Sequence, residues 1–396
     1  MRLSQISTSP VALYASVGAM LTRYAVDVEA AELTVCETVE LPENVHYAWP
    51  HASGRYLYVA TSNSPPGLGP AGDSHHVTAF ALERKTGALT RHGVPIALPT
   101  RPIHISTDIP SRNLLVAFSN PGDFRIYRIA DDASLGSEVP QRTIDIGIYP
   151  HQVLPTPDGK RVILVTRGHD PREGKPEEPG ALKVFEYEDG VLGREASIAP
   201  NDGFGFGPRH LDFHPTQPWI YVSLERQNAL SLFTMDQGEV AEAPVCSLTT
   251  LTHPDDARQR QLAGTVHVHP NGCFVYGVNR ASAAVQFQGR RVFAGGENSF
   301  AVYAIDPRSG RPTLIQHADT RGIHCRTFHI DPSGRLLVAA HIEGMDVQDG
   351  DAIHTIPARL SLFRIGEDGR LSFVRAYDVD VGDKMMFWMG MVRLEV

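Results

Sequence analysis

The sequence predicts an all-β fold, a seven-bladed β-propeller, from three observations. First, one unit recurs: a polar or cationic residue, a short apolar run, a turn, and a second strand rich in β-branched and aromatic residues. Second, the copies are spaced by several tens of residues, which suits four short strands per unit better than a helical repeat. Third, the two chain ends carry complementary incomplete copies. Such units must stack on neighbours to bury their apolar faces.

Six complete copies align on the residue eight positions before the turn. With Gly54, Arg112, Gly159, Gln217, Gly272 and Gly334 as turn residues, the aligned position holds His46, His104, His151, Arg209, Gly264 and Arg326. The second strand is apolar, as in Tyr56-Leu57-Tyr58-Val59-Ala60, and the third alternates, as in Leu182-Lys183-Val184-Phe185-Glu186-Tyr187. Alternating runs separated by Gly, Asp and Pro predict antiparallel strands.

The seventh blade is expected to combine the two ends of the chain. The segment from Leu13 to Leu41 supplies later strands of a unit, and Met385-Met386-Phe387-Trp388-Met389 supplies a first strand. Joined, they close the ring and remove the exposed edges of an open sheet. The chain is therefore interpreted as a single propeller domain over residues 1–396.

Composition limits the partners and the compartment. Lys and Arg number 36 against 45 Asp and Glu, a net charge of −9, and no dense basic stripe occurs, so neither nucleic acid nor an anionic membrane is an expected partner. There is no apolar run of about 18 residues, and polar residues interrupt Met1–Met20 where a signal peptide would be apolar. The four cysteines form no CxxC pair and are interpreted as reduced thiols. We expect a cytoplasmic protein, a monomer or a weak homodimer.

Propeller geometry places the candidate site on one face. The start of each first strand and the end of each second strand lie on the same face of the ring, because the two run antiparallel. Four long segments follow second strands, and we expect them to wall a pocket: Asn63–His76, Arg167–Gly180, Ala281–Asn298 and His341–Ala358.

Polar and cationic side chains gather on that face. They are His46, His104, His151, Arg209 and Arg326 at the starts of first strands, with Glu225 and Arg280 at the ends of second strands. This set suits a small anionic or oxygen-rich ligand. In one alternative, Arg209 and Glu225 form only a structural ion pair. In another, His46, His104 and His151 hold a divalent metal with an open position for water.

Several segments carry a family resemblance. They are Arg101-Pro102-Ile103-His104-Ile105-Ser106-Thr107-Asp108, Tyr149-Pro150-His151-Gln152-Val153, Gly207-Pro208-Arg209-His210-Leu211-Asp212-Phe213-His214-Pro215 with Glu225, His267-Val268-His269-Pro270-Asn271-Gly272 with Asn279-Arg280, and Arg326-Thr327-Phe328-His329-Ile330-Asp331-Pro332-Ser333-Gly334. In this order, from about Leu13 to Val392, they resemble the lactonase family of seven-bladed propellers. That family includes bacterial propeller-type 6-phosphogluconolactonases and fungal carboxy-cis,cis-muconate cyclases.

The resemblance implies a hydrolase acting on the lactone of a sugar acid or a related small carboxylic acid, with no cofactor. The catalytic residues it implies are His151, Arg209, Glu225 and Arg280, and the expected substrate-binding residues are His46, His104, His210, His324 and Arg326. The two catalytic arginines would bind the lactone carbonyl or an acidic group. His151 and Glu225 would divide the acid and base roles, in an order that the sequence leaves open.

Two further interpretations remain open at this point. The same residues would serve a cycloisomerase that forms or opens a lactone by adding a carboxylate across a double bond. A propeller can also act as a protein-binding platform, because a fold does not dictate a function. Departures from the family pattern, such as Ile323-His324-Cys325 before Arg326 and the methionine-rich last strand, leave the substrate open.

Overall fold

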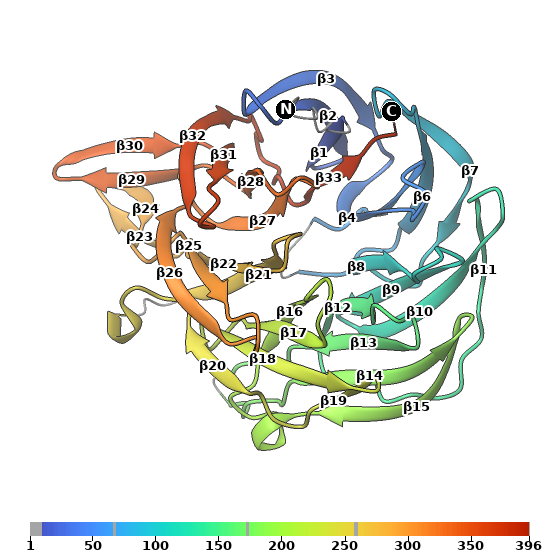
Figure 1. Ribbon diagram of the computed structural model, residues 1–396. Helices are drawn as coiled ribbons and strands as arrows, with labels where there is room; N and C mark the ends of the chain where they lie inside the picture. Colours follow the sequence, from blue (N-terminus) through green and yellow to red (C-terminus); the bar gives the residue numbers. More distant parts are fainter. Residues whose placement is uncertain (1–9, 66–68, 172–173, 257–259, 396) are drawn as a thin grey trace, which may run out of the picture.

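The computed structural model describes residues 10–65, 69–171, 174–256 and 260–395, and the first nine residues of the stretch inspected for a signal peptide lie outside this range. Its strands form a ring of antiparallel sheets around a central channel (Figure 1). Seven of these sheets are the blades, which confirms the predicted seven-bladed β-propeller. No helix among the described residues is long and apolar enough to cross a membrane.

The first four blades follow the chain in order. Blade 1 contains β4 (Asn44–Pro50), β5 (Tyr56–Ser62), β6 (His75–Leu82) and β7 (Leu89–Ala97). Blade 2 contains β8 (Pro102–Thr107), β9 (Asn113–Ser119), β10 (Gly122–Ile129) and β11 (Leu135–Glu138). Blade 3 contains β12 (Pro150–Pro155), β13 (Arg161–Thr166), β14 (Ala181–Glu188) and β15 (Val191–Ile198). Blade 4 contains β16 (Pro208–Phe213), β17 (Trp219–Leu224), β18 (Ala229–Asp236), β19 (Glu239–Val240) and β20 (Cys246–Thr249).

The remaining blades complete the ring. Blade 5 contains β21 (Leu262–Val268), β22 (Phe274–Arg280), β25 (Ser299–Ile305) and β26 (Pro312–Asp319). Blade 6 contains β27 (Cys325–Ile330), β28 (Leu336–His341), β31 (Arg359–Ile365) and β32 (Leu371–Asp378). Blade 7 contains β1 (Val11–Val17), β2 (Met20–Asp27), β3 (Glu32–Glu40) and β33 (Met389–Arg393). Two short 3-10 helices, η1 (Pro200–Gly203) and η2 (Pro254–Asp256), lie between strands.

Blade 7 closes the ring as expected, with β33 from one chain end pairing antiparallel to β1 from the other. The predicted closing strand was placed too early, because β33 begins at Met389 rather than Met385. Before it, the amide of Trp388 donates to Ser16 Oγ (3.1 Å) and the amide of Ser16 donates to the carbonyl of Trp388 (2.9 Å). Both the side chain and the backbone of Ser16 thus bind the backbone of Trp388, a contact that the sequence of Met385–Trp388 does not predict.

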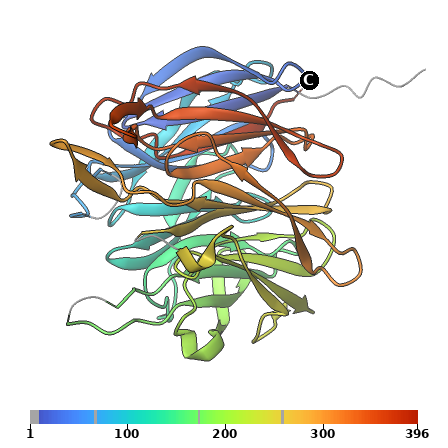
Figure 2. The ribbon, with the colours of Figure 1, turned by 90° about the vertical axis from the view of Figure 1, so that its left-hand side faces the viewer.

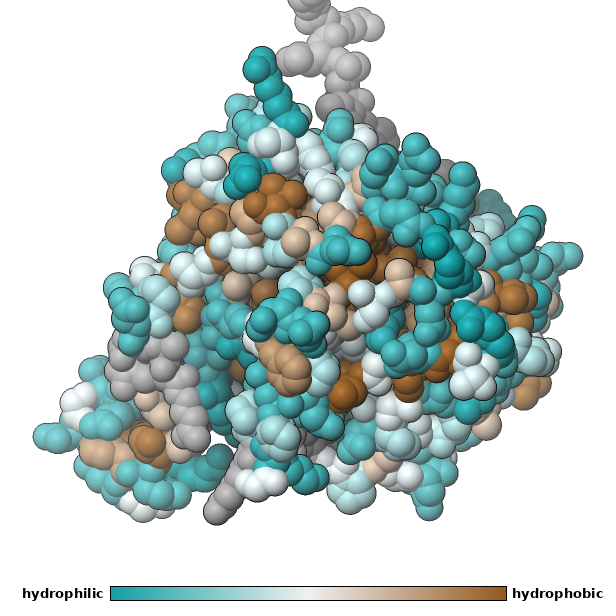
Figure 3. Space-filling model, turned by 90° about the horizontal axis from the view of Figure 1, so that it is seen from below, coloured by the Kyte–Doolittle hydropathy of each residue, from teal (hydrophilic) through white to brown (hydrophobic). Residues whose placement is uncertain are grey.

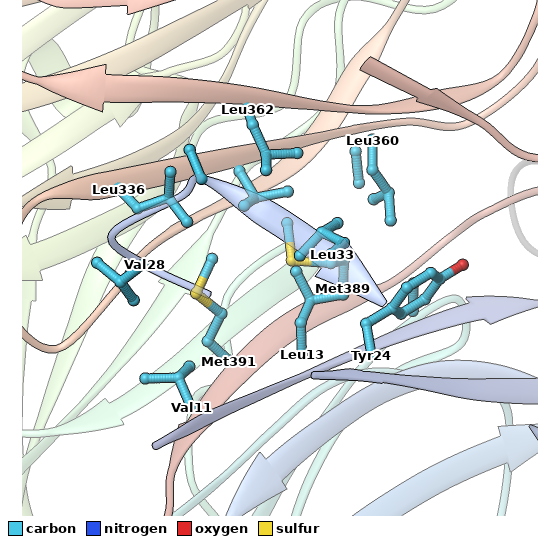
Figure 4. Packing of buried hydrophobic residues seen from close by; sticks show 14 of the residues in the cluster. Val11, Leu13, Tyr24, Val28, Leu33, Leu336, Leu360, Leu362, Met389 and Met391 are labelled. Atoms are coloured by element: carbon cyan, nitrogen blue, oxygen red, sulfur yellow. The ribbon is translucent and has the colours of Figure 1, made fainter. Parts of the chain in front are cut away.

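The hydrophobic core lies between neighbouring blades. Figure 4 shows the cluster where blade 6 meets blade 7: Leu336, Leu360 and Leu362 pack against Leu13 and the methionines of β33. The side chains of Leu13, Leu336 and Leu360 are completely buried. Each blade therefore depends on its neighbours for burial, as in other repeat folds. The face seen in Figure 3 is different, with separate hydrophobic patches among hydrophilic residues.

The turns between first and second strands correct one alignment. Gly54, Gly159, Gly272 and Gly334 have positive φ, and in blade 2 the same conformation belongs to Ser111 (φ 52°), not to Arg112. Ser111 makes the matching turn, in which its amide donates to the carbonyl of Asp108 (2.9 Å). The residue type did not mark this turn, because serine seldom adopts a left-handed backbone conformation. The residue equivalent to His46 and His151 is consequently Ile103, and His104 lies one position further along β8.

Two of the four long segments contain strands that the sequence analysis did not predict. The segment after β22 forms the hairpin of β23 (Ala284–Phe287) and β24 (Arg290–Phe293), and the segment after β28 forms the hairpin of β29 (Met345–Asp349) and β30 (Ala352–Ile356). The two hairpins join into one small sheet through the parallel neighbours β24 and β29. Positive φ at Gln288 and Gly289 gives the two-residue turn that matches strand twist.

The small sheet of these two hairpins projects outward from blades 5 and 6, to the left in Figure 1, and its strands also appear in the view of Figure 2. The segments 63–76 and 167–180 include residues outside the described ranges. The four segments leave the second strands at the same end of the channel at which the first strands begin.

Replacing Leu13 by Ala is expected to lower the free energy of unfolding by about 3 kcal/mol, because it leaves a cavity where blades 6 and 7 meet. The matched control is Val35→Ala on β3 of the same blade, where the side chain is 65% exposed. That change should alter stability by less than about 0.5 kcal/mol. Urea unfolding followed by circular dichroism measures both, and equal effects would contradict the closing role of this cluster.

Candidate active site

Two rings of positions meet at the mouth of the channel. In the first ring a bulge interrupts the pairing of the first strand, and the bulge residue is His46 in β4, His151 in β12, Arg209 in β16 and Arg326 in β27. A bulge re-aims a side chain away from the regular alternation of a strand. The second ring, eight residues after each turn, contains Arg167, Glu225 and Arg280 on consecutive blades.

Arg167 is a site residue that the sequence analysis missed. It was treated only as the start of a long segment, although it has the same offset from its turn residue Gly159 as Glu225 has from Gln217. Applying the repeat offset in both directions would have found it. The Arg167 guanidinium lies 4.5 Å from the ring centroid of Tyr149 and also pairs with Glu225.

Glu225 is the centre of a buried cluster of arginines. Its Oε1 lies 2.9 Å from Nε of Arg209 and also accepts a hydrogen bond from Arg280, and its Oε2 accepts from Arg167. The side chain of Glu225 is 3% exposed and that of Arg209 is 1% exposed. The ion pair proposed as a structural alternative therefore exists, but it is part of a larger group of three arginines around one carboxylate.

The charges of this cluster are strongly coupled. Burial by itself raises the pKa of Glu225, but the charges of Arg167, Arg280 and Arg209 outweigh it and bring the pKa to about 2. Burial and the nearby Arg280 charge lower the pKa of Arg326 to about 9. Glu225 is consequently an anion at neutral pH. Its single negative charge does not balance the positive charges of the arginines around it.

His324 and Arg326 extend the cluster on blade 6. Arg280 Nη1 donates to His324 Nε2 (2.9 Å), and His324 Nδ1 in turn donates to Ser282 Oγ (2.7 Å). The Arg326 guanidinium lies 3.5 Å from the ring centroid of Phe387. Its Nη1 is buried and has no hydrogen-bond partner among the described residues. The positively charged fork of Arg326 is thus fixed by stacking while part of its donor capacity stays free.

His151 is a buried, neutral imidazole beside the arginines. Burial, followed by the charges of Arg209 and Arg326, holds its pKa well below the usual range for histidine. Its Nδ1 has no hydrogen-bond partner in the described part of the chain. The ring lies 5.2 Å from that of His210, centroid to centroid, and Nη1 of Arg209 is 3.4 Å from His210 Nε2.

The predicted substrate-binding residues do not all reach the same depth. His46 stays at the mouth, where Nε2 donates to the carbonyl of Ser64 (3.1 Å) and the ring lies 5.6 Å from Phe387. His104 lies deeper, with its ring 4.2 Å from that of Tyr47, because its place in β8 is one residue past the bulge. His104 and His210 therefore form a floor beneath the cluster rather than part of its rim.

The three-histidine metal arrangement was wrong in its geometry. It assumed equivalent positions for His46, His104 and His151, and the register of β8 gives His104 a different height in the channel. Within residues 10–65, 69–171, 174–256 and 260–395, no three or more His, Cys, Asp or Glu side chains form a group that could hold a metal ion.

The segment between β13 and β14 is tied to blade 4 next to this cluster. Arg226 follows Glu225, and its side chain is 5% exposed. Its Nε lies 3.3 Å from Asp170 Oδ1 and its Nη2 lies 3.2 Å from Glu177 Oε1. These contacts hold the segment against the wall of the mouth, so Arg167 at its base keeps a defined position.

Comparison with known proteins assigns the family. The sequence profile described as "Lactonase, 7-bladed beta-propeller" matches residues 10–349. The chain belongs to this lactonase family. The match confirms the predicted resemblance and the predicted class of enzyme, a hydrolase acting on a lactone.

Relatives of this lactonase-family chain carry consistent names. It is 28% identical over 306 residues to a 6-phosphogluconolactonase of Bacillus subtilis (strain 168), covering 73% of this chain and 78% of the relative. It is 27% identical over 314 residues to a 6-phosphogluconolactonase of Enterobacter sp. (strain 638), covering 78% and 81%. Among solved structures, the periplasmic gluconolactonase of Pseudomonas aeruginosa superposes with a TM-score of 0.74 at 19% identity, covering 98% of this chain and 100% of that one. That likeness supports the fold.

Buried histidines predict a steep loss of stability in mild acid. Burial is the largest cause that lowers the pKa of His46 and His104 to about 3, and of His329 and His341 to about 4. Between pH 6.5 and about 4 these histidines bind protons in the unfolded chain but not in the folded protein. The free energy of unfolding therefore decreases as the pH is lowered through this range. Each contributes up to about 1.4 kcal/mol per pH unit.

Urea unfolding at pH 7.5, 6.5, 5.5 and 4.5 measures this dependence. His341→Gln, in which one titrating group is removed, should show a shallower dependence than the unchanged protein. A free energy of unfolding that stays constant from pH 6.5 to 4.5 would contradict the buried neutral state of these histidines.

Proposed function

We propose that the chain hydrolyses the lactone of a sugar acid that carries a second anionic group, a phosphate or a carboxylate. The observation that carries the proposal is the group of three guanidinium groups, Arg167, Arg209 and Arg280, that contact the single carboxylate of Glu225. The buried Arg326 adds a fourth positive charge near Arg280. The relatives named 6-phosphogluconolactonase support a phosphorylated substrate.

The charge of the cluster favours an anionic ligand. Burying a cation without a partner is costly, and here one carboxylate faces several cations. Burial and the Arg280 charge also lower the pKa of Arg209. A bound phosphate or carboxylate would supply the missing negative charge, and the unpartnered Nη1 of Arg326 supplies a donor for it.

Arg209 and Arg280 suit the role of stabilising the oxyanion. Both guanidinium groups are held by Glu225, so their positions are set before the substrate binds. Fixed donors of this kind stabilise charge that develops on a carbonyl oxygen during attack. Glu225 serves as the anion that orients them, since its pKa of about 2 leaves it unable to donate a proton at neutral pH.

His151 suits the proton-transfer role. It is neutral, and its Nδ1 is free among the described residues. In the proposed reaction His151 takes a proton from water as the water oxygen bonds to the lactone carbonyl carbon. The tetrahedral intermediate collapses with cleavage of the ring C–O bond, and the imidazolium returns the proton to the leaving alkoxide. The product is the open hydroxy acid, so one water is consumed per lactone.

The remaining predicted residues support binding and enclosure. His324 is hydrogen-bonded to Arg280 and lies between that arginine and Ser282, where it holds the guanidinium in place. His46 and Arg326 flank Phe387 at the mouth. His104 and His210 close the site from below. We further propose a small-molecule substrate as the main partner and the cytoplasm as the compartment, which the four free thiols support.

Ring opening of a lactone panel tests this proposal. The panel contains a phosphorylated sugar lactone, unphosphorylated aldonolactones and a muconolactone. Wild-type protein should prefer the phosphorylated lactone, and Arg209→Ala should lower kcat/KM by about 10²- to 10³-fold, because it removes an oxyanion donor. The control is Arg125→Ala, which removes an arginine from a surface ion pair and should leave the rate unchanged.

Two outcomes would redirect the assignment. Equal inactivity of wild type and Arg209→Ala across the panel would contradict a lactonase. Deuterium exchange from solvent at the carbon next to the carboxylate, without net hydrolysis, would instead establish cycloisomerase chemistry at the same residues.

Replacement of Arg167 tests the arrangement around Glu225. The Arg167 charge is one of the groups that lower the pKa of Glu225, so Arg167→Ala should raise that pKa. Protonation of Glu225 then releases Arg209 and Arg280 at mildly acidic pH, and kcat/KM should fall more at pH 5 than at pH 8. Arg167→Lys keeps the charge and should retain most of the wild-type pH profile. A proportional loss at every pH would contradict the proposal that Arg167 acts through the ionisation of Glu225.

A further inference from the structure

The central channel contains a cavity beneath the arginine cluster. Its volume is about 230 Å³, and it lies against the inner strands β4, β21, β27 and β33. It extends to Pro50 and Val392, towards the ends of their strands that lie away from the candidate active site. No arginine is among the residues that line it. The cavity therefore has a different chemical character from the mouth above it.

A layer of rings separates the cavity from the arginines. Tyr47 lines the cavity and packs on His104, with the centroids 4.2 Å apart. The ring of His104 lies 6.3 Å from that of His210, which is next to Arg209. A ligand in the lower cavity would consequently meet aromatic side chains and imidazoles instead of guanidinium groups.

Two polar groups from β27 face this cavity. Thr327 is 4% exposed, and its Oγ1 has no hydrogen-bond partner among the described residues. His329 lies two residues further on the same strand, so both side chains point to the same side. His329 Nδ1 donates to the carbonyl of Ile330 (3.1 Å), which leaves Nε2 as an acceptor. The pair offers one hydroxyl and one ring nitrogen to a bound molecule.

The walls define the rest of the ligand. Trp49, Trp388 and Phe328 supply flat apolar surfaces, which favour an aromatic ring. The lining contains no Lys, Arg, Asp or Glu, and burial lowers the pKa of His329 to about 4, so His329 is neutral at pH 7. His267 also lines the cavity, and its Nδ1 lies 3.4 Å from Asp212 Oδ2, so that ring is already paired with a carboxylate. An ionised ligand would lose its hydration without gaining a counter-ion. The volume lies between the roughly 150 Å³ of a cavity that admits benzene and the pockets of about 300 Å³ or more that hold larger ligands.

We propose that this lower cavity is a second binding site for a neutral single-ring aromatic alcohol of the phenol class. The ring lies between the tryptophans, the ligand hydroxyl accepts a hydrogen bond from Thr327, and it donates to His329 Nε2. The site is independent of the proposed lactone hydrolysis and uses none of the residues of that reaction.

Phenol itself is the probe for the experiment, and the full-length protein is used. The chain contains three tryptophans, of which Trp49 and Trp388 line the cavity and Trp219 belongs to blade 4. In a Trp219→Phe variant the remaining tryptophans both line the cavity, so tryptophan fluorescence reports its occupancy. The excitation wavelength is longer than the wavelengths that phenol absorbs. We expect saturable quenching with a dissociation constant on the order of 1 mM or below. Toluene, without the hydroxyl, should bind more weakly, and benzoate should not bind.

Thr327→Val is the decisive variant, because it keeps the shape of the side chain and removes only the hydroxyl. It should weaken phenol binding about fivefold and leave toluene binding unchanged. Thr22→Val, on β2 at the outside of the ring, is the matched control and should bind phenol normally. Arg209→Ala should also bind phenol normally.

Three results would overturn the proposal. They are an absence of saturable phenol binding to the folded protein, equal phenol affinity in Thr327→Val and wild type, or loss of phenol binding in Arg209→Ala. The last result would place phenol in the upper site. Failure of the lactonase assay would leave this test intact, since its readout is tryptophan fluorescence.

Discussion

Pairing between β33 and β1 is the constraint on which the other features depend. It joins the two ends of the chain in one blade, so that seven inner strands surround a closed channel. The core between blade 6 and blade 7 then buries residues from both chain ends, including Leu13 and Met391. Only in a closed ring do first strands from separate blades bring their leading residues to a common mouth.

At that mouth a repeated backbone feature carries a varied set of side chains. The bulge in the first strand and the residue eight positions after the turn occur in blade after blade, and they place Arg209, Glu225 and Arg280 within contact. Burial alone would raise the pKa of Glu225, but the charges of the surrounding arginines lower it to about 2. A propeller can therefore keep one architecture and change its ligand by replacing residues at these two positions.

Below the mouth, the same channel changes from charged to aromatic. The floor of rings formed by His104, His210 and Tyr47 separates an arginine-rich upper site from a lower cavity bounded by tryptophans. The contrast arises along the inner strands. The bulge residue of each strand lies at the mouth, and the residues that follow it, such as Tyr47 and His104, lie deeper in the channel and are of a different chemical type. One tunnel thus offers two chemically distinct environments.

The sequence by itself determined the blade number, the closure by both chain ends, and several residues at the mouth, among them Arg209, Glu225 and Arg280, because strand periodicity and repeat spacing are local properties of a chain. It placed His104 there as well, and the register of β8 sets that residue deeper. It did not reveal that Ser111 takes the turn position, that Arg167 faces Glu225, or that hairpins after β22 and β28 join in one sheet. Only the tertiary structure decided these points. They depend on contacts between distant blades and on a left-handed serine that packing must hold, and neither is encoded in a local pattern.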